Sequence, residues 1–159
     1  MENNVVLAFV GMPGSGKSEA VAYLKSRGIP NVRFGQFTEE KLQELGLQIT
    51  PENEKNVREQ LRFEYGMEAY AMLGRPRIEV LLKDNPIVAI DGLYSWEEYV
   101  FLKKAFPKLT LIYIFARPGI RHQRLSKRKI RPLTEKQAKL RDVLEIEKLH
   151  KGGPIAIAD

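Results

Sequence analysis

The chain has 159 residues, of which 43% are hydrophobic, and it contains no cysteine. This length allows one well-filled core, so we expect a single domain over residues 1–159, without disulfides, thiolate zinc sites or thiol catalysis. The longest apolar runs, near residues 5–10 and 109–116, are too short to span a bilayer, and the first four residues carry no basic leader region. We therefore predict a cytoplasmic protein with no membrane partner.

The net charge of +6 is unevenly distributed along the chain. Residues 1–100 have a net charge of −4, whereas residues 101–159 have a net charge of +10. A basic segment often binds an anion, such as nucleic acid, lipid or a phosphorylated small molecule. A solvated basic surface without a specific partner has the same composition, and charge alone favours that interpretation.

Short apolar runs alternate with longer helical patterns. Strands are predicted at residues 5–10, 32–34, 86–90, 110–115 and 155–158. The runs near Val5, Val88 and Leu111 are continuously apolar, which is typical of parallel strands covered by helices on both faces. The alternation predicts a three-layer α/β domain.

Helix boundaries carry their usual signals. Residues 17–27 form an amphipathic pattern that ends at Gly28, a residue type favoured just after a helix. Thr50-Pro51 is typical of an N-cap followed by a first-turn proline. Ser95 and Thr134 each precede a Glu or Gln by three residues, the spacing of a capping box.

The strongest motif lies between the first strand and the first helix. Gly11-Met12-Pro13-Gly14-Ser15-Gly16-Lys17-Ser18 matches the phosphate-binding loop G-x-x-x-x-G-K-[ST]. Its glycines let successive N–H groups point inward as an anion nest, and the following helix adds its positive end. We predict that this segment binds ATP, with Lys17 on the β- and γ-phosphates and Ser18 on Mg²⁺. A plain glycine-rich turn is the alternative, and the Lys17-Ser18 pair argues against it.

Asp91 directly follows the predicted strand at residues 86–90. P-loop proteins place a second magnesium-side carboxylate at such a position. The alternative is an ordinary turn, because Asp91-Gly92 is a common turn pair. Chain order favours the magnesium role.

Three segments together resemble the nucleoside-monophosphate-kinase-like branch of P-loop proteins. They are the phosphate-binding loop, Ile90-Asp91-Gly92 with its capped helix, and the stretch from Gln123 to Arg141. The second resembles the Asp-Gly step of adenylate kinases, and the third resembles the lid of dephospho-CoA kinases. The nearest likeness is to dephospho-CoA kinases and to an archaeal group related to adenylate kinase.

This resemblance implies a five-stranded parallel sheet of order 2-3-1-4-5. It also implies a helical acceptor-binding insertion at about residues 35–83 and a lid at about residues 128–141. Lid arginines in such enzymes close over ATP, and that role would fall on Arg124, Arg128 and Arg141. A guanidinium suits it because it pairs two phosphate oxygens and stays charged. The spacing agrees with this role, because Arg121, Arg124 and Arg128 share one helical face. An exposed basic helix surface is the alternative.

Two positions depart from the pattern. Relatives carry an acidic residue after the second strand, where this chain has Gln36, and adenylate kinases carry an arginine after the Asp-Gly step, where it has Tyr94. An amide cannot accept a proton, so no general base is expected at position 36. Arg62 resembles a residue of the archaeal group's acceptor-side helix, or else is a surface residue paired with Glu59.

Three functions follow as hypotheses. The first is an ATP- and Mg²⁺-dependent kinase of a nucleotide-like or phosphorylated small molecule, with Gln36 and Arg62 near the acceptor. The second is an ATP-binding regulatory protein with slow ATPase activity. The third, a nucleic-acid-dependent NTPase, is disfavoured because residues 117–151 contain no aromatic residue for base stacking.

The remaining candidates are assigned ordinary roles. His122 and His150 lack metal-ligand spacing, so we expect surface residues, and we expect Trp96 to pack rather than stack on a base. Related folds continue with another helix after the fifth strand, so we expect further residues beyond Asp159 in a longer protein.

Overall fold

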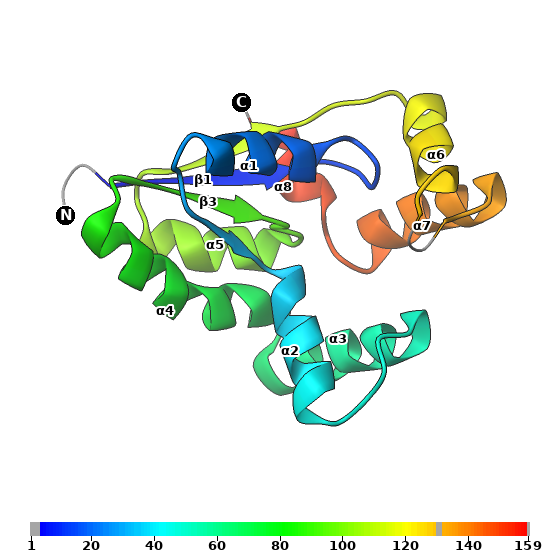
Figure 1. Cartoon of the computed structure of the whole chain (residues 1–159), viewed down its shortest axis with the longest axis horizontal. Helices are drawn as coiled ribbons and strands as arrows, with labels where there is room; N and C mark the ends of the chain where they lie inside the picture. The colour runs from blue at the N-terminus through cyan, green and yellow to red at the C-terminus, as the bar shows by residue number, and fades with distance from the viewer. Residues whose placement is uncertain (1–3, 130–131, 159) are drawn as a thin grey trace.

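The computed structural model describes residues 4–129 and 132–158 (Figure 1). Residues 130 and 131 of the predicted lid fall outside this description, as do residues 1–3 and 159. The described residues form one four-stranded parallel sheet in the order β2-β3-β1-β4. Its strands are β1 (Val5–Val10), β2 (Asn31–Arg33), β3 (Ile87–Asp91) and β4 (Leu109–Tyr113).

Helices cover both faces of the sheet, as the apolar strands predicted. The helix α1 (Lys17–Ser26) lies on one face, while α4 (Ala69–Asp84) and α5 (Trp96–Ala105) lie on the other (Figure 1). The alternation along β1 divides the core accordingly. Val6 and Ala8 join the larger cluster under α4 and α5, whereas Leu7 and Phe9 pack with α1. The three-layer α/β class is therefore confirmed.

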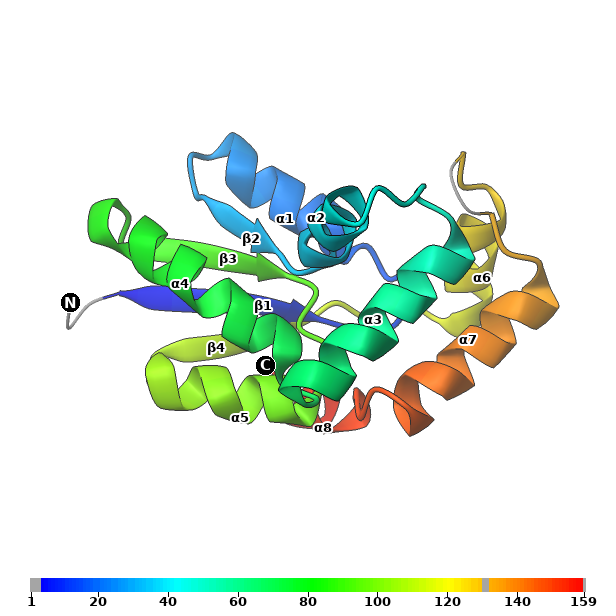
Figure 2. The same cartoon turned by 90° about the horizontal axis from the view of Figure 1, so that it is seen from below.

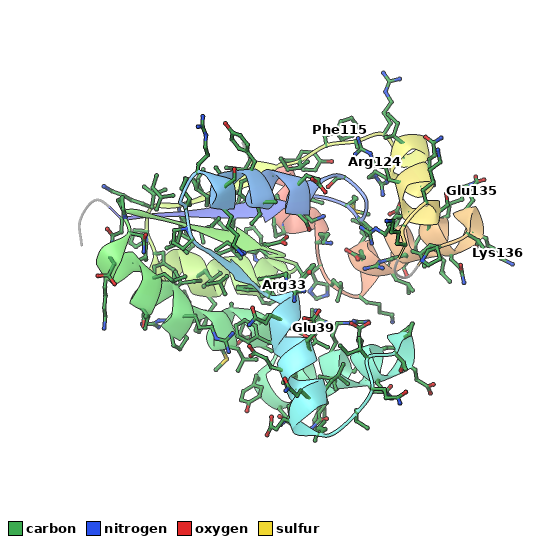
Figure 3. All side chains as sticks on the ribbon, viewed as in Figure 1. Arg33, Glu39, Phe115, Arg124, Glu135 and Lys136 are labelled. Atoms are coloured by element: carbon green, nitrogen blue, oxygen red, sulfur yellow. The ribbon has the colours of Figure 1, made fainter. Side chains whose placement is uncertain are left out.

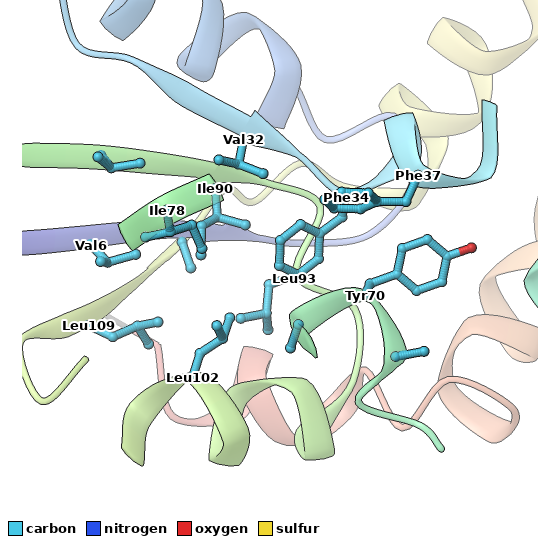
Figure 4. Packing of buried hydrophobic residues seen from close by; sticks show 14 of the residues in the cluster. Val6, Val32, Phe34, Phe37, Tyr70, Ile78, Ile90, Leu93, Leu102 and Leu109 are labelled. Carbon is cyan, nitrogen blue, oxygen red and sulfur yellow. The ribbon is translucent and has the colours of Figure 1, made fainter. Parts of the chain in front are cut away.

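The larger cluster holds the sheet to its helices (Figure 4). Ile90 of β3, Ile78 of α4 and Leu102 of α5 are all completely buried. Burial of one such side chain contributes about 1.5–3 kcal/mol relative to exposure. The buried Tyr70 hydroxyl lies 2.6 Å from that of Thr38, so this polar group keeps a hydrogen-bond partner.

Two further helix pairs lie past the carboxyl ends of the strands (Figures 1 and 2). One pair is α2 (Gly35–Glu44) with α3 (Pro51–Tyr65), and the other is α6 (Pro118–Ser126) with α7 (Glu135–Glu147). In open α/β sheets, ligands bind outside the carboxyl ends of the strands. The space between these pairs is therefore where a site is expected.

The predicted helix boundaries are confirmed by their caps. Thr50 accepts a hydrogen bond from the backbone N–H of Asn53. Ser95 and Thr134 both form complete capping boxes. Gly28 follows α1 with a φ of 81°, a left-handed conformation that glycine adopts without a Cβ penalty.

The predicted strand at residues 155–158 is wrong. Gly152–Ala156 form a short helix, α8, which packs on α5. The described sheet thus differs from the predicted order 2-3-1-4-5, because it has four strands and no fifth position beside β4. A short apolar run cannot distinguish a strand from a helix by periodicity, and here Ile155 and Ala158 reach the core from α8 and the turn after it.

Within residues 4–129 and 132–158, no helix is both long and apolar enough to cross a bilayer.

Candidate active site

The phosphate-binding loop joins β1 to α1 and depends on its glycines. Gly11, Gly14 and Gly16 have φ values of 146°, 79° and 110°. A Cβ on Gly11 would lie 2.5 Å from the carbonyl oxygen of Ile114, and one on Gly14 would lie 2.8 Å from that of Arg121. In both cases the contacted atom belongs to the backbone, which cannot shift without a large cost in free energy. The loop therefore requires glycine for space as well as for conformation.

The start of α1 is arranged to receive an anion. Its N-cap, Gly16, makes no side-chain capping bond, so the backbone N–H groups of the first turn remain available to an anion at the positive end of the helix. The Ser15 hydroxyl is buried, and within the described part of the chain it has no hydrogen-bond partner. Buried polar groups are normally paired. A bound phosphate would satisfy these donors, so the loop fits a nucleotide.

Lys17 folds back on the loop. Its Nζ donates to the carbonyl oxygens of Gly11, at 2.8 Å, and Met12, at 3.1 Å. Burial lowers the pKa of Lys17 to about 8, and the nearby Lys151 cation acts in the same direction. A phosphate beside this ammonium would supply the negative charge that favours its protonated form.

Ser18 and Asp91 meet at the end of β3. The Ser18 hydroxyl donates to Asp91 Oδ2 over 3.3 Å. Burial raises the pKa of Asp91, although the Ser18 hydrogen bond and Lys17 oppose this. A hydroxyl and a carboxylate are hard oxygen ligands of the kind that Mg²⁺ takes beside nucleotide phosphates and water. The donor set therefore fits magnesium.

These groups open into one pocket of about 190 Å³. Its charged lining consists of five cationic and two anionic side chains, so it suits an anionic ligand. The lining residues are Pro13, Gly14, Lys17, Ser18, Arg33, Gly35, Asp91, Tyr94, Arg128, Arg141, Glu145 and Lys151.

The structure brings most of the predicted catalytic residues to this pocket. Arg128, just after α6, and Arg141, in α7, line it together with Lys17 and Asp91. Arg124 lies beside the loop instead (Figure 3), where its Nη1 donates to the carbonyl oxygens of Gly14 and Ser15.

Gln36 and Arg62, the predicted substrate residues, do not line the pocket. The Gln36 amide donates to Glu40 Oε1 at 2.8 Å, and Gln36 faces a separate groove along α4. The Arg62 guanidinium lies 5.4 Å from the centre of the Tyr70 ring. The expected alternative partner of Arg62, Glu59, is instead within 3.8 Å of Lys55. A substrate would have to extend beyond the pocket to meet either predicted residue.

Arg121 and His122 are structural in this fold. The Arg121 guanidinium donates to both oxygens of Asp142, at 2.7 and 2.8 Å, and to the carbonyl oxygen of Pro13. His122 Nε2 lies 2.9 Å from Asp142 Oδ2. His122 is buried, so the prediction of a surface histidine is wrong. The reason is its partner in α7, which the sequence around His122 does not indicate.

The sequence did not single out three lining residues. Arg33, at the end of β2, lines the pocket and pairs with Glu39 (Figure 3). Glu145 and Lys151 pair with each other and are both buried. No local spacing marks these residues as part of a site. Glu145 and Lys151 come together through the turn between α7 and α8, and Arg33 reaches the pocket from the end of β2.

The comparisons with known proteins agree with this architecture. A family model described as an AAA domain matches residues 7–157. UPF0200 proteins of Thermococcus gammatolerans and Thermococcus sibiricus are 36% and 38% identical over 159 residues, which cover 98% of this chain and 83% of each relative. The chain belongs to the AAA-domain family and to the UPF0200 proteins.

Solved structures show the same fold at low identity. A shikimate kinase from Bacteroides thetaiotaomicron has a TM-score of 0.59 at 14% identity, covering 98% of this chain and 84% of that one. The fold is therefore that of P-loop kinase-like proteins. The finer likeness to dephospho-CoA kinases or to the adenylate-kinase-related group is not established by these matches and stays a prediction.

Proposed function

We propose that the protein is an ATP- and Mg²⁺-dependent phosphotransferase acting on a small, phosphate-bearing or nucleotide-like acceptor. The observation that carries this proposal is the contact between Ser18 and Asp91 beside Lys17. It joins the phosphate-binding loop to the end of β3 and creates an oxygen site next to a phosphate cradle. Phosphoryl transfer needs positioning and charge stabilisation more than covalent chemistry from the protein.

Each group in the pocket has a defined task in this proposal. The loop N–H groups and the Ser15 hydroxyl bind the phosphate oxygens, and Lys17 turns from the loop carbonyls to the β- and γ-phosphates. Ser18 and Asp91 would hold Mg²⁺, which supplies Lewis-acid stabilisation of the phosphates. Asp91 is thereby committed to the metal side and is not free to act as a base.

The arginines divide into two groups. Arg128 and Arg141 line the pocket and, in the proposed lid of residues 128–141, stabilise charge that develops on the transferring group. Arg124 fixes the main chain of the loop through two carbonyl oxygens, so we propose that it positions the cradle. The α2–α3 pair, within residues 35–83, provides the proposed acceptor side.

The acceptor is inferred from the groups at hand. A hydroxyl acceptor, such as that of dephospho-CoA, gains from a carboxylate that accepts its proton. Gln36 is an amide and faces another groove, and Asp91 serves the metal. A phosphate acceptor is already ionised near neutral pH and needs no base. This favours a nucleoside monophosphate or a similar phosphate-bearing molecule.

A transfer assay tests the proposal. Native protein and Gln36→Asp are incubated with ATP·Mg²⁺ and, in parallel, with nucleoside monophosphates and dephospho-CoA. Transfer to a phosphate-bearing acceptor by native protein is expected. Activity on dephospho-CoA alone would refute the phosphate acceptor. Slow ATP hydrolysis with no transfer to any acceptor would favour a regulatory ATPase.

A further inference from the structure

The most buried cation that lines the pocket comes from the C-terminal part of the chain. Lys151 precedes α8 and is only 1% exposed, yet it lines the same pocket as Lys17. Its Nζ donates to Glu145 and lies 4.9 Å from the centre of the Tyr94 ring. An ammonium has three N–H donors, and in the described part of the chain only the one to Glu145 is used.

The backbone is held in an unusual conformation to place this lysine. His150 has a φ of 51°, and it is the one non-glycine residue with positive φ in the described ranges. Such conformations persist when surrounding contacts enforce them. His150 Nδ1 lies 2.9 Å from Glu97 Oε1, and a Cβ on Gly153 would lie 2.9 Å from the ring of Trp96. Two contacts with α5 thus fix the turn that directs Lys151 inward.

Glu145 links Lys151 to a second cation. Its Oε1 lies 3.3 Å from Nε of Arg141, and its other oxygen accepts from Lys151. Burial opposes ionisation of Glu145, but Lys151 and Arg141 outweigh it and hold its pKa below the usual value. The carboxylate is therefore charged, and it is shared by two cations that both face the pocket.

A purely structural pair would not need this location. Buried ion pairs are often replaceable by apolar residues without loss of stability, whereas this one stands at the wall of a cationic pocket. Lys17 and the proposed Mg²⁺ already counter much of the triphosphate charge. Lys151 has no task in ATP binding in the proposed function and is therefore available to a second anion, and Arg141, which shares Glu145 with it, lies where it can contact both that anion and the transferring group.

We propose that Lys151 and Arg141 form the binding subsite for the phosphate of the acceptor, with Glu145 holding both cations until that phosphate arrives. This subsite rests on the proposed function for its role in transfer. Tyr94 contributes the ring face that supports the ammonium. The acceptor phosphate competes with Glu145 for the two cations.

If phosphate competes with Glu145 for Lys151, substitutions of these two residues should change phosphate affinity in opposite directions. A pair with only a structural role would not show this. The experiment saturates the protein with Mg²⁺ and AMPPNP, a non-hydrolysable ATP analogue, and then titrates inorganic phosphate by calorimetry. Lys151→Met should weaken phosphate binding at least tenfold. Glu145→Gln should tighten it several-fold, because the competing charge is gone. Lys148→Met, an exposed lysine on the same segment, should leave it unchanged.

Stability is controlled with a double variant. Lys151→Met leaves Glu145 without its buried partner and can unfold the protein. The double variant Lys151→Met/Glu145→Gln carries neither charge of the pair and should show the same loss of phosphate binding. Acetate in place of phosphate should bind at least tenfold more weakly to native protein.

The subsite would be overturned if Lys151→Met and Glu145→Gln changed phosphate affinity in the same direction or not at all. Equal binding of acetate would overturn its assignment to phosphate. Failure of native protein to bind AMPPNP would instead refute the proposed function. In that case, phosphate would be titrated without nucleotide into native protein, Lys151→Met and Glu145→Gln. Opposite changes of phosphate affinity in the two variants would still support the subsite, and their absence would still overturn it.

Discussion

The guanidinium of Arg121 holds both carboxylate oxygens of Asp142, at 2.7 and 2.8 Å, and also donates to the carbonyl oxygen of Pro13. One buried side chain thereby connects α6, α7 and the phosphate-binding loop. The side chains of the pair are only 6% and 18% exposed. The geometry of the loop is thus coupled to the helix that carries Arg141.

Asp142→Asn should destabilise the fold, because it leaves Arg121 buried with a neutral partner. Loss of one member of a buried pair costs about 3–5 kcal/mol, and denaturant unfolding at pH 7 measures it. Glu135→Gln breaks the exposed pair with Lys139 and should change stability much less, because water and salt screen an exposed ion pair. Equal effects of the two substitutions would contradict the buried role of Arg121.

The Asp142 carboxylate should also make the stability of the fold depend on pH. Burial opposes ionisation of Asp142, but Arg121 and His122 outweigh it and lower its pKa. Because the pKa of Asp142 is lower in the folded protein than in the unfolded chain, where it is near 3.8, ionised Asp142 stabilises the fold above that pH. This stabilisation is lost as the pH falls through the pKa of the folded protein. Asp142→Asn should therefore approach native stability in acid.

Gly14→Ala should damage the site far more than Gly28→Ala. Both glycines have positive φ, of 79° and 81°, but a Cβ on Gly28 meets nothing within 4 Å, whereas one on Gly14 meets the backbone of Arg121 at 2.8 Å. Gly28→Ala should cost only the conformational penalty, about 1–2 kcal/mol, and keep ATP affinity. Gly14→Ala should weaken ATP binding more than about tenfold. Indistinguishable ATP affinities, measured by calorimetry, would count against the cradle.

Glu98 should make the native protein less stable as pH rises. Its Oε2 accepts from the backbone N–H groups of Tyr94 and Ser95, and burial raises its pKa to about 7. The unfolded carboxyl ionises near 4.5, so stability should fall between pH 4.5 and 7, by up to about 3 kcal/mol. Glu98→Gln keeps the capping box and should lack this slope in urea unfolding. The same dependence of stability on pH in native protein and in Glu98→Gln would contradict a raised pKa of the buried Glu98.

ATP affinity should fall above pH 8. Without nucleotide the pKa of Lys17 is about 8, and bound phosphates raise it by favouring the charged form. Below pH 8 the lysine is protonated in both states, so affinity is flat. At pH 9 binding must take up a proton, and affinity should be about tenfold weaker. Calorimetry in two buffers of different ionisation enthalpy detects this proton, and Lys17→Arg, always charged, should take up none.

The parts of the site that sequence predicted are those set by local rules. The loop from Gly11 to Ser18 is a contiguous motif, and Asp91 follows from its place at a strand end. Capping residues predicted helix starts for the same reason. Each of these depends on neighbours within a few positions.

The rest depends on contacts between distant segments. Arg121 and Asp142 pair across two helices, and Lys151 reaches the pocket through the positive φ of His150. The apolar run at residues 155–158 is compatible with a strand or a helix, and in the structure its first residues belong to α8, which packs on α5. Neither local propensity nor spacing encodes these outcomes.

Calorimetry of ATP·Mg²⁺ binding to native protein and to Lys17→Ala at pH 7 tests most directly whether the loop from Gly11 to Ser18 binds the nucleotide. Native protein should bind ATP at a single site. Loss of the charge-assisted contact costs about 1.5–3 kcal/mol, so binding to the variant should be roughly ten- to a hundredfold weaker. Unchanged ATP affinity in Lys17→Ala would contradict the assignment of this loop as the nucleotide site.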